Sequence, residues 1–400
     1  MQTRYQSAAL AALVVSAALM TAGAAPAVAA YPDQIRKAAA GSQHFDSLAG
    51  VAAISRRDAW AVGCKQDRNG SCTSTLIEHW NGRKWSTMRS PNPGHSDGLN
   101  SISATSRDNA WAVGGYSGGA LALRWTGHRW RRVPTASQRN ARLDSVAAIS
   151  RTNAWAVGCK MDQNGLSCIS TLIEHWNGTQ WLRVPSPNPP GGAVLAAVTA
   201  ISPDNIWAVG EHDNGNTVLT LVEHWTGSSW KQVPAKNPGG TGESYFTGVS
   251  ASAPGNVWAV GVVNADPADN APAQTLTEHW NGSSWQVVPS PNPGNGALGN
   301  TLNDVAAISA KDAWAVGDFQ GSAHDLLLAE HWNGRKWRTV PILYPAGPKP
   351  FFDLFGITAL SASNAWAVGE NDPNFLTPGL RTVIVHWNGT EWTRAASPNP

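Results

Sequence analysis

Charged residues are scarce in this chain of 400 residues, in which Asp, Glu, Lys and Arg together make up 14%. The 29 Lys and Arg nearly balance the 27 Asp and Glu, which leaves a net charge of +2. This balance gives no sign of a nucleic-acid-binding surface or of a polybasic membrane patch. Disorder is not expected either, because disordered chains combine few aromatic residues with a high net charge.

Recognisable catalytic motifs are missing as well. The sequence has no HExxH zinc motif, no GxSxG nucleophile motif and no phosphate-binding glycine loop. It contains only 5 Tyr and 4 Cys, which is few for a copper oxidase site if the cysteines are paired. We therefore expect no catalytic residue, no resident metal and no cofactor.

Tryptophan, in contrast, is abundant, with 21 residues against 7 Phe and 5 Tyr. All of them belong to a unit that occurs seven times and begins with Trp-Ala-Val-Gly. A second Trp follows in each unit, and a third lies five residues after the second. The first members are Trp60, Trp111, Trp155, Trp207, Trp258, Trp314 and Trp366. A residue that every unit requires is expected to serve packing rather than ligand binding.

Each unit contains four short apolar runs, which in the third copy span 146–150, 153–158, 171–176 and 181–185. Their length, their β-branched and aromatic residues and the turn residues between them predict strands, here called a to d. Seven such units predict an all-β fold, a seven-bladed β-propeller of four-stranded antiparallel blades. No strand is left over for a mixed closing blade, so we expect blade-to-blade packing to close the ring.

The domain boundaries follow from this repeat. We expect a signal peptide at 1–29, an irregular lead-in at 30–47 and the propeller at 48–400. The expected blades are 48–98, 99–142, 143–193, 194–245, 246–301, 302–353 and 354–400.

The unit resembles the repeat of the Kelch and galactose-oxidase central-domain family. Trp111-Ala-Val-Gly-Gly115 provides that family's glycine doublet, and His-Trp-Asn-Gly-x-x-Trp provides its aromatic part. The tryptophan after a hairpin turn is also similar to the Asp-box of sialidase-like propellers. The resemblance implies a propeller fold, while the alanine-rich N-terminus is what suggests a secreted bacterial protein.

An apolar, alanine-rich run at 8–25, followed by Ala27-Val28-Ala29, is typical of a signal peptide. The alternative is a retained N-terminal anchor; no other run is long enough to span a membrane. Export into an oxidising environment favours two local disulfides, Cys64 with Cys72 and Cys159 with Cys168. A metal site is the other interpretation, but the spacing lacks a short Cys pair and a nearby His.

The connections between strands differ in a way that predicts where a ligand binds. The a–b and c–d turns are short and uniform, and in a propeller they share one face. The b–c and d–a connections carry the variation in length and share the other face, where binding is expected. Its candidate ligand-binding residues are Tyr116, Glu211, His212, Asp213, Tyr245, Asp318, Phe319, Phe351, Glu370, Asp372 and Phe375.

Two other patterns admit chemical interpretations. Calcium suits the Asp and Asn oxygens of these loops, although no loop has the EF-hand pattern. A Glu-His pair recurs before the second Trp, as at Glu174-His175. Adjacent residues of a strand point to opposite faces, so each pair is not a catalytic dyad. We expect these side chains to form hydrogen bonds between blades.

Three hypotheses about function remain. The first is a secreted, non-enzymatic binding or scaffold propeller for a cell-surface glycan or a protein partner. It would be a monomeric ring, alone or as the targeting subunit of an extracellular hetero-assembly. The second is a secreted carbohydrate-active oxidase, hydrolase or lyase. The third is a scaffold that binds a peptide in its central channel.

Overall fold

The computed structural model describes residues 45–67, 70–137, 139–240, 242–264, 272–294, 299–321, 325–342, 351–372 and 381–398. Their secondary structure consists entirely of strands, and no helix long and apolar enough to cross a membrane occurs among them. The predicted signal peptide and Phe375 lie outside the described residues.

The strands form seven four-stranded antiparallel sheets, each built from consecutive strands. Strands a are β1 (Phe45–Ser55), β5 (Gly98–Ser106), β9 (Ala141–Ser150), β13 (Ala193–Ser202), β17 (Ser244–Ala253), β21 (Asn300–Ser309) and β25 (Phe351–Ser361). Strands b are β2 (Asp58–Gln66), β6 (Asn109–Tyr116), β10 (Asn153–Met161), β14 (Asn205–Asp213), β18 (Asn256–Val263), β22 (Asp312–Gln320) and β26 (Asn364–Asp372). Strands c are β3 (Cys72–Trp80), β7 (Gly119–Trp125), β11 (Cys168–Trp176), β15 (Val218–Trp225), β19 (Gln274–Trp280), β23 (Asp325–Trp332) and β27 (Arg381–Trp387). Strands d are β4 (Trp85–Thr87), β8 (Trp130–Arg132), β12 (Trp181–Arg183), β16 (Trp230–Gln232), β20 (Trp285–Val287), β24 (Trp337–Thr339) and β28 (Trp392–Arg394).

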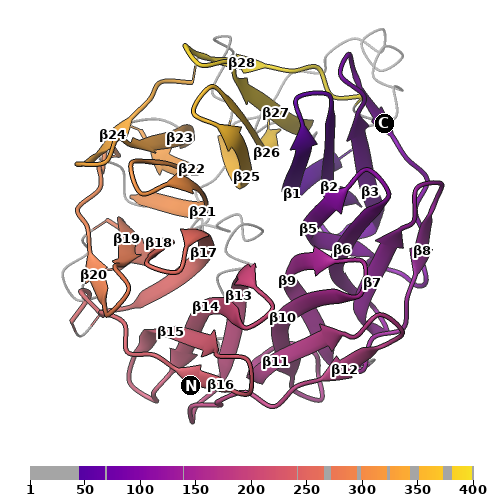
Figure 1. Ribbon diagram of the computed structural model, residues 1–400, viewed down its shortest axis with the longest axis horizontal. Helices are drawn as coiled ribbons and strands as arrows, with labels where there is room; N and C mark the ends of the chain where they lie inside the picture. Colours follow the sequence, from indigo (N-terminus) through magenta and orange to yellow (C-terminus); the bar gives the residue numbers. More distant parts are fainter. Residues whose placement is uncertain are drawn as a thin grey trace, which may run out of the picture.

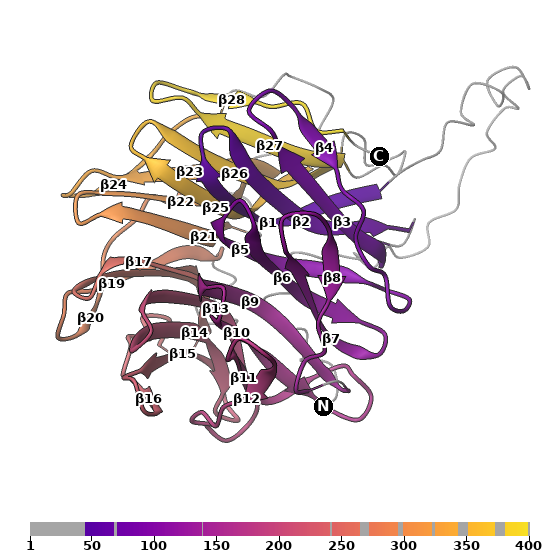
Figure 2. The same cartoon turned by 45° about the vertical axis from the view of Figure 1, so that its right-hand side comes forward.

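The sheets are the blades of a ring (Figure 1), in which strands a surround the centre and the short strands d lie on the rim. The seventh blade stands beside the first, and the tilted view of Figure 2 shows the same neighbours. The amide of Ala53 donates to the hydroxyl of Thr358 across this junction, at 3.4 Å. The predicted fold class is therefore confirmed, and the ring closes without a mixed blade.

The blades begin slightly earlier than the sequence analysis expected. Strand β1 starts at Phe45 rather than Leu48, because Phe45, Asp46 and Ser47 pair with the end of β2. Strand β25 likewise starts at Phe351 rather than Leu354. The end of the predicted lead-in is thus part of the first blade.

The tryptophans form the contacts between blades. Trp207 of the fourth blade is 1% exposed and packs against Trp280 and Trp285 of the fifth, with ring centroids 4.9 and 5.5 Å apart. The same triad recurs at every junction and closes the ring where Trp366 contacts Trp80 and Trp85. The predicted packing role of the tryptophans is confirmed.

The glycine of Trp-Ala-Val-Gly is required by close backbone packing inside each blade. A Cβ atom on Gly63 would lie 2.0 Å from the carbonyl oxygen of Ser47. Strand β1 bulges next to this contact, between Leu48 and Gly50. No side chain fits at that approach, which explains a glycine in every copy.

Candidate functional site

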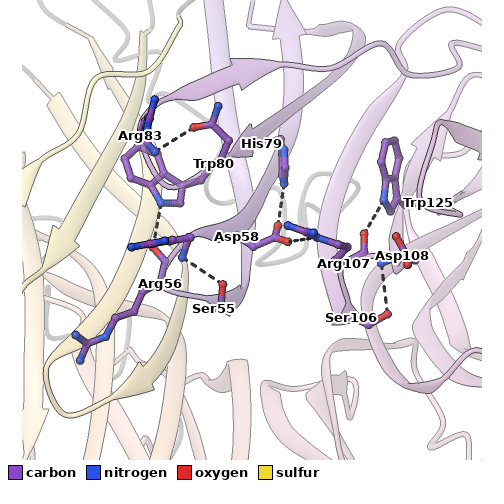
Figure 3. A network of polar contacts seen from close by, with 12 residues as sticks. Ser55, Arg56, Asp58, His79, Trp80, Arg83, Ser106, Arg107, Asp108 and Trp125 are labelled. Atoms are coloured by element: carbon purple, nitrogen blue, oxygen red, sulfur yellow. Dashed lines mark hydrogen bonds and ion pairs between the residues drawn. The ribbon is translucent and has the colours of Figure 1, made fainter.

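The two faces of the ring are built differently, one from uniform turns and the other from variable loops. We call the face that carries the a–b and c–d turns the turn face. In the first blade, Nε2 of His79 lies 2.8 Å from the carboxylate of Asp58, and the His79 ring stacks on Trp60. The indole of Trp80 donates to the carbonyl of Arg56 (Figure 3). Equivalent His–Asp or His–Asn pairs occur in the blades that have this His, at 2.7–3.1 Å.

These pairs correct one prediction. The histidines bond within their own blade, whereas we expected bonds between blades. Strand pairing explains the difference, because it places His79 directly opposite Trp60 and near the start of β2. Burial lowers the pKa of His175, as it does for three further histidines of the repeat. The second blade has Arg124 instead, whose guanidinium lies 5.2 Å from the ring of Trp111.

The glutamates of the Glu-His pairs do connect blades, as expected. Glu174 is fully buried and accepts the backbone N–H groups of Ala136 and Ser137, at 3.0 and 2.7 Å, from the second blade. Glu278 accepts the N–H of Lys236, from the fourth blade. The hydroxyl of Ser397 donates to Glu78 where the ring closes.

Two glutamates at the same position have no such donor. Glu223 and Glu330 are 0% exposed, and no carboxyl oxygen of either has a hydrogen-bond partner among the described residues. Burial raises the pKa of each to about 8. At neutral pH both groups are therefore mainly protonated, and they act as structural polar groups inside the ring.

The opposite surface, which we call the loop face, is where the repeat ends. Trp-Ala-Val-Gly is the same in all seven blades, but five different residue types occupy the next position. Because side chains alternate along a strand, this position shares the side of strand b that bears the first Trp, and so points towards the following blade. Its occupants are Cys64, Gly115, Cys159, Glu211, Val262, Asp318 and Glu370.

Both disulfides lie at this layer and confirm the predicted pairing. Cys64 is bonded to Cys72 and Cys159 to Cys168, with Cα–Cα distances of 5.5 and 5.6 Å. Each bond ties the ends of strands b and c together at the loop face. The described residues contain no free cysteine.

Carboxylates from three blades lie close enough to Tyr245 of β17 for their charges to act on its hydroxyl. Burial is the main cause that raises the pKa of Tyr245, and the charges of Glu211, Glu243 and Asp318 raise it further. These groups come from the fourth, fifth and sixth blades, so the loop face brings together three of the predicted residues. Tyr245 stays protonated at neutral pH, which does not suit a nucleophilic tyrosinate. Asp318 also accepts hydrogen bonds from Thr301 and Asn303.

Two other predicted residues, Tyr116 and Phe319, are engaged by other parts of the structure. Tyr116 is held by Arg132, whose guanidinium donates to its hydroxyl at 2.7 Å and lies over its ring. Phe319 packs into the core between the fifth and sixth blades. Glu370 is 7% exposed at the end of β26. The side chains of Phe351 and Asp372 lie outside the described part of the structure.

His212 and Asp213 end strand β14. Burial lowers the pKa of His212, and the charge of Asp213 partly opposes this. The Asp213 carboxylate accepts the N–H of Gly215 at 2.6 Å, which holds the following turn. Within the described ranges, no group of three or more His, Cys, Asp or Glu is placed to hold a metal ion.

One recurrent element was not predicted from the sequence. A Ser-Pro-Asn-Pro segment follows strand d in several blades and folds back on strand c. In the first blade, the side chain of Asn92 accepts the N–H of Thr75 at 2.7 Å, and the Thr75 and Ser90 hydroxyls are 2.5 Å apart. The equivalent segment of the third blade borders a cavity of about 340 Å³ lined by Thr171, Ser186 and Asn188. These lining groups already bond to one another. The repetition of Ser-Pro-Asn-Pro in the sequence was the available signal.

No family model and no curated protein sequence matches the chain. Among solved structures, it is similar to a polysaccharide lyase of a new family, the PL25 ulvan lyase bound to -[GlcA(1-4)Rha3S]-. The TM-score is 0.57 at 11% identity, covering 87% of this chain and 93% of that chain. It is also similar to YCF48 from Cyanidioschyzon merolae, with a TM-score of 0.53 at 15% identity, covering 85% of this chain and 95% of that one. YCF48 bound to D1 peptide matches with a TM-score of 0.46 at 12% identity, covering 74% and 80%.

At such low identity the first two matches show a shared propeller fold and nothing about the ligand. The resemblance to Kelch repeats is not supported by these comparisons and stays a prediction.

Proposed function

We propose that this protein is a secreted, non-enzymatic binding propeller whose loop face takes a neutral glycan or a protein partner. The observation that carries this proposal is the layer after Trp-Ala-Val-Gly, where seven equal blades become chemically different. Below that layer every blade repeats the same tryptophan contacts. Above it, the side chains are no longer dictated by the architecture, so they are free to serve recognition.

The cluster around Tyr245 is the part of the loop face best suited to a ligand. Carboxylates accept hydrogen bonds from sugar hydroxyls or from a partner's cationic side chains, and an aromatic ring provides apolar contact area. Glu211 and Asp318 come from blades on either side of Tyr245, so a ligand that spans them would contact three blades. We infer that the ring acts alone or as a targeting subunit of an extracellular assembly.

Secretion and the non-enzymatic character are part of the proposal. The two disulfides suit an oxidising compartment, and the protonated state of Tyr245 gives no support to a sialidase-like nucleophile. The alternative of a carbohydrate-active enzyme makes a different prediction, turnover of an oligosaccharide. No side-chain arrangement described above favours it.

The test compares the wild type with the triple variant E211Q/Y245F/D318N on a glycan array and in pull-downs from culture supernatant. We expect one glycan or partner to be retained by the wild type and lost by the variant. The matched control R335A/K336A/R338A changes three residues at the sixth blade's c–d turn and strand d, remote from this cluster, and should bind like the wild type. Ligand binding that survives the loop-face variant, or no ligand for the wild type in either assay, would contradict the proposal.

A further inference from the structure

The turn face carries a strong local excess of positive charge that the overall balance conceals. Three arginines occupy the second position of consecutive a–b turns, and we call Arg56, Arg107 and Arg151 the arginine arc. Further cations on the turns of the same blades are Arg57, Arg83, Lys84 and Arg129. All seven of these side chains are exposed.

The members of the arc form a continuous row, because each reaches back over the preceding blade. Arg56 donates to the hydroxyl of Ser363 at 3.3 Å, across the closure of the ring. Arg107 lies 3.8 Å from Asp58 (Figure 3), and Arg151 lies 3.8 Å from Asp108. The row therefore covers three junctions, those between the seventh and first, the first and second, and the second and third blades.

These contacts leave most of the charge available. The side chains of Arg107 and Arg151 are 82% and 63% exposed, and ion pairs at such exposure contribute little. Asp58 already bonds to His79, which leaves Asp108 as the more accessible of the two carboxylates in these pairs. Each guanidinium has five N–H donors, so several remain for a ligand.

The architecture does not need these cations. The second Trp of a blade bonds to the backbone carbonyl of the turn position, whether the residue there is Arg56, Arg107, Ala310 or Ala362. The a–b and c–d turns of the fourth and fifth blades contain no Lys or Arg at all. A cluster that the fold does not require is a candidate for binding.

We propose that the arginine arc binds an acidic polysaccharide by pairing its guanidinium groups with uronate carboxylates. Arginine suits this ligand because its planar fork matches the two oxygens of a carboxylate. A row of exposed cations on neighbouring blades suits a linear polymer that carries one carboxylate after another. The carboxylates of the loop face repel such a polymer, so the two faces take different ligands.

A nucleic acid fits the same surface less well. Proteins that hold single strands present aromatic faces for base stacking, whereas Trp125 and Trp176 next to the arc are only 7% and 4% exposed and Trp80 is half-buried. The indole N–H of Trp125 is also occupied, by the carbonyl of Arg107. The two disulfides in addition suit an oxidising compartment outside the cell rather than one that holds nucleic acid.

The test measures binding of fluorescein-labelled polygalacturonate at low salt to the wild type and to the variant R56A/R107A/R151A. Alanine occupies this turn position naturally in the sixth and seventh blades, so the variant is expected to fold, which its unfolding midpoint checks. We expect the dissociation constant to rise at least tenfold. The salt dependence should also weaken, by roughly 2 in the slope of log Kd against log salt.

Two controls separate this site from general charge and from the loop face. R335A/K336A/R338A removes the same charge from the sixth blade and should change the dissociation constant less than twofold. E211Q/Y245F/D318N should bind polygalacturonate like the wild type, so failure of the loop-face proposal would leave this one standing. Neutral dextran should not bind.

Several results would overturn the proposal. They are no binding of polygalacturonate by the wild type, equal binding by the folded arc variant, or an equal loss in the sixth-blade control. Tighter binding of a short DNA duplex than of polygalacturonate at the same salt would assign the arc to nucleic acid instead.

Discussion

The buried carboxyl groups of Glu223 and Glu330 provide a direct test of how the blades are joined. Glu174 and Glu278 at the same position accept N–H groups from the preceding blade. The residue that supplies this N–H, six positions after the third Trp, is Ala136 or Lys236. The blades that precede Glu223 and Glu330 have Pro187 and Pro291 there, and proline has no N–H to donate.

The missing donor makes stability depend on pH in a defined direction. The pKa of each group is about 8 in the folded protein against an ordinary value of 4.5. Below about pH 4.5 both the folded and the unfolded chain hold the proton, and there is no penalty. Between these values only the folded chain keeps it, so the free energy of unfolding falls by about 1.4 kcal/mol per pH unit for each group. Above about pH 8 the folded group ionises too, and the fall ends.

The variant E223Q/E330Q removes both titrations. Urea unfolding followed by tryptophan fluorescence at pH 5.5, 6.5 and 7.5 gives the free energy of unfolding for both proteins. The difference should move in favour of the variant by about 2.8 kcal/mol per pH unit, because two protons are involved. Glu78, Glu278 and Asp304 also have a raised pKa, but they are present in both proteins and cancel.

The control is E391Q, which changes an exposed glutamate in a c–d turn and should leave the pH dependence of the wild type intact. Parallel pH curves for the wild type and E223Q/E330Q would refute the reasoning. They would mean that the two carboxyl groups are already ionised in the folded ring at neutral pH.

Three further predictions use the same unfolding assay. Pro187→Ala supplies an N–H opposite Glu223, so the midpoint should fall less between pH 5.5 and 7.5 than in the wild type; an unchanged fall would contradict the role given to the proline. Trp207→Ala removes an indole buried between two blades and should lower the free energy of unfolding by about 3–5 kcal/mol, whereas a loss below about 1 kcal/mol would show that the junction is loose. C64S/C72S opens a short covalent loop and should lower the free energy of unfolding by about 2.5 kcal/mol. Reduction of the wild type opens both disulfides and should lower that free energy at least as much.

The sequence was sufficient for the fold because its signals are local and repeated. Seven copies of Trp-Ala-Val-Gly, with turn residues at constant offsets, specify the same hairpins seven times. The pairing of Cys64 with Cys72 was predictable for the same reason, since only a few residues separate them. The direction of the Glu174 contact was also correct, because strand alternation separates Glu from His.

The errors came from contacts that depend on register and on long-range packing. His79 bonds within its own blade because of the register in which β2 pairs with β3. Residue spacing alone does not predict that register. The contact of Arg132 with Tyr116, sixteen residues away in sequence, was likewise not predicted. The charges that act on Tyr245 come from three blades, and the spacing of these residues in the sequence does not predict that they act together.

The arginine arc shows why the overall charge was a poor guide to surface chemistry. A net charge of +2 averages over the whole chain, but a propeller sorts its turns onto one face and its loops onto the other. Arg56, Arg107 and Arg151 are far apart in sequence, yet each is the second residue of an a–b turn, and the ring places consecutive turns side by side. In a repeat protein, charge is therefore best counted by position within the repeat. By that count, the turns of the first three blades and of the sixth are basic, those of the fourth and fifth are not, and the fold that carries them is the same.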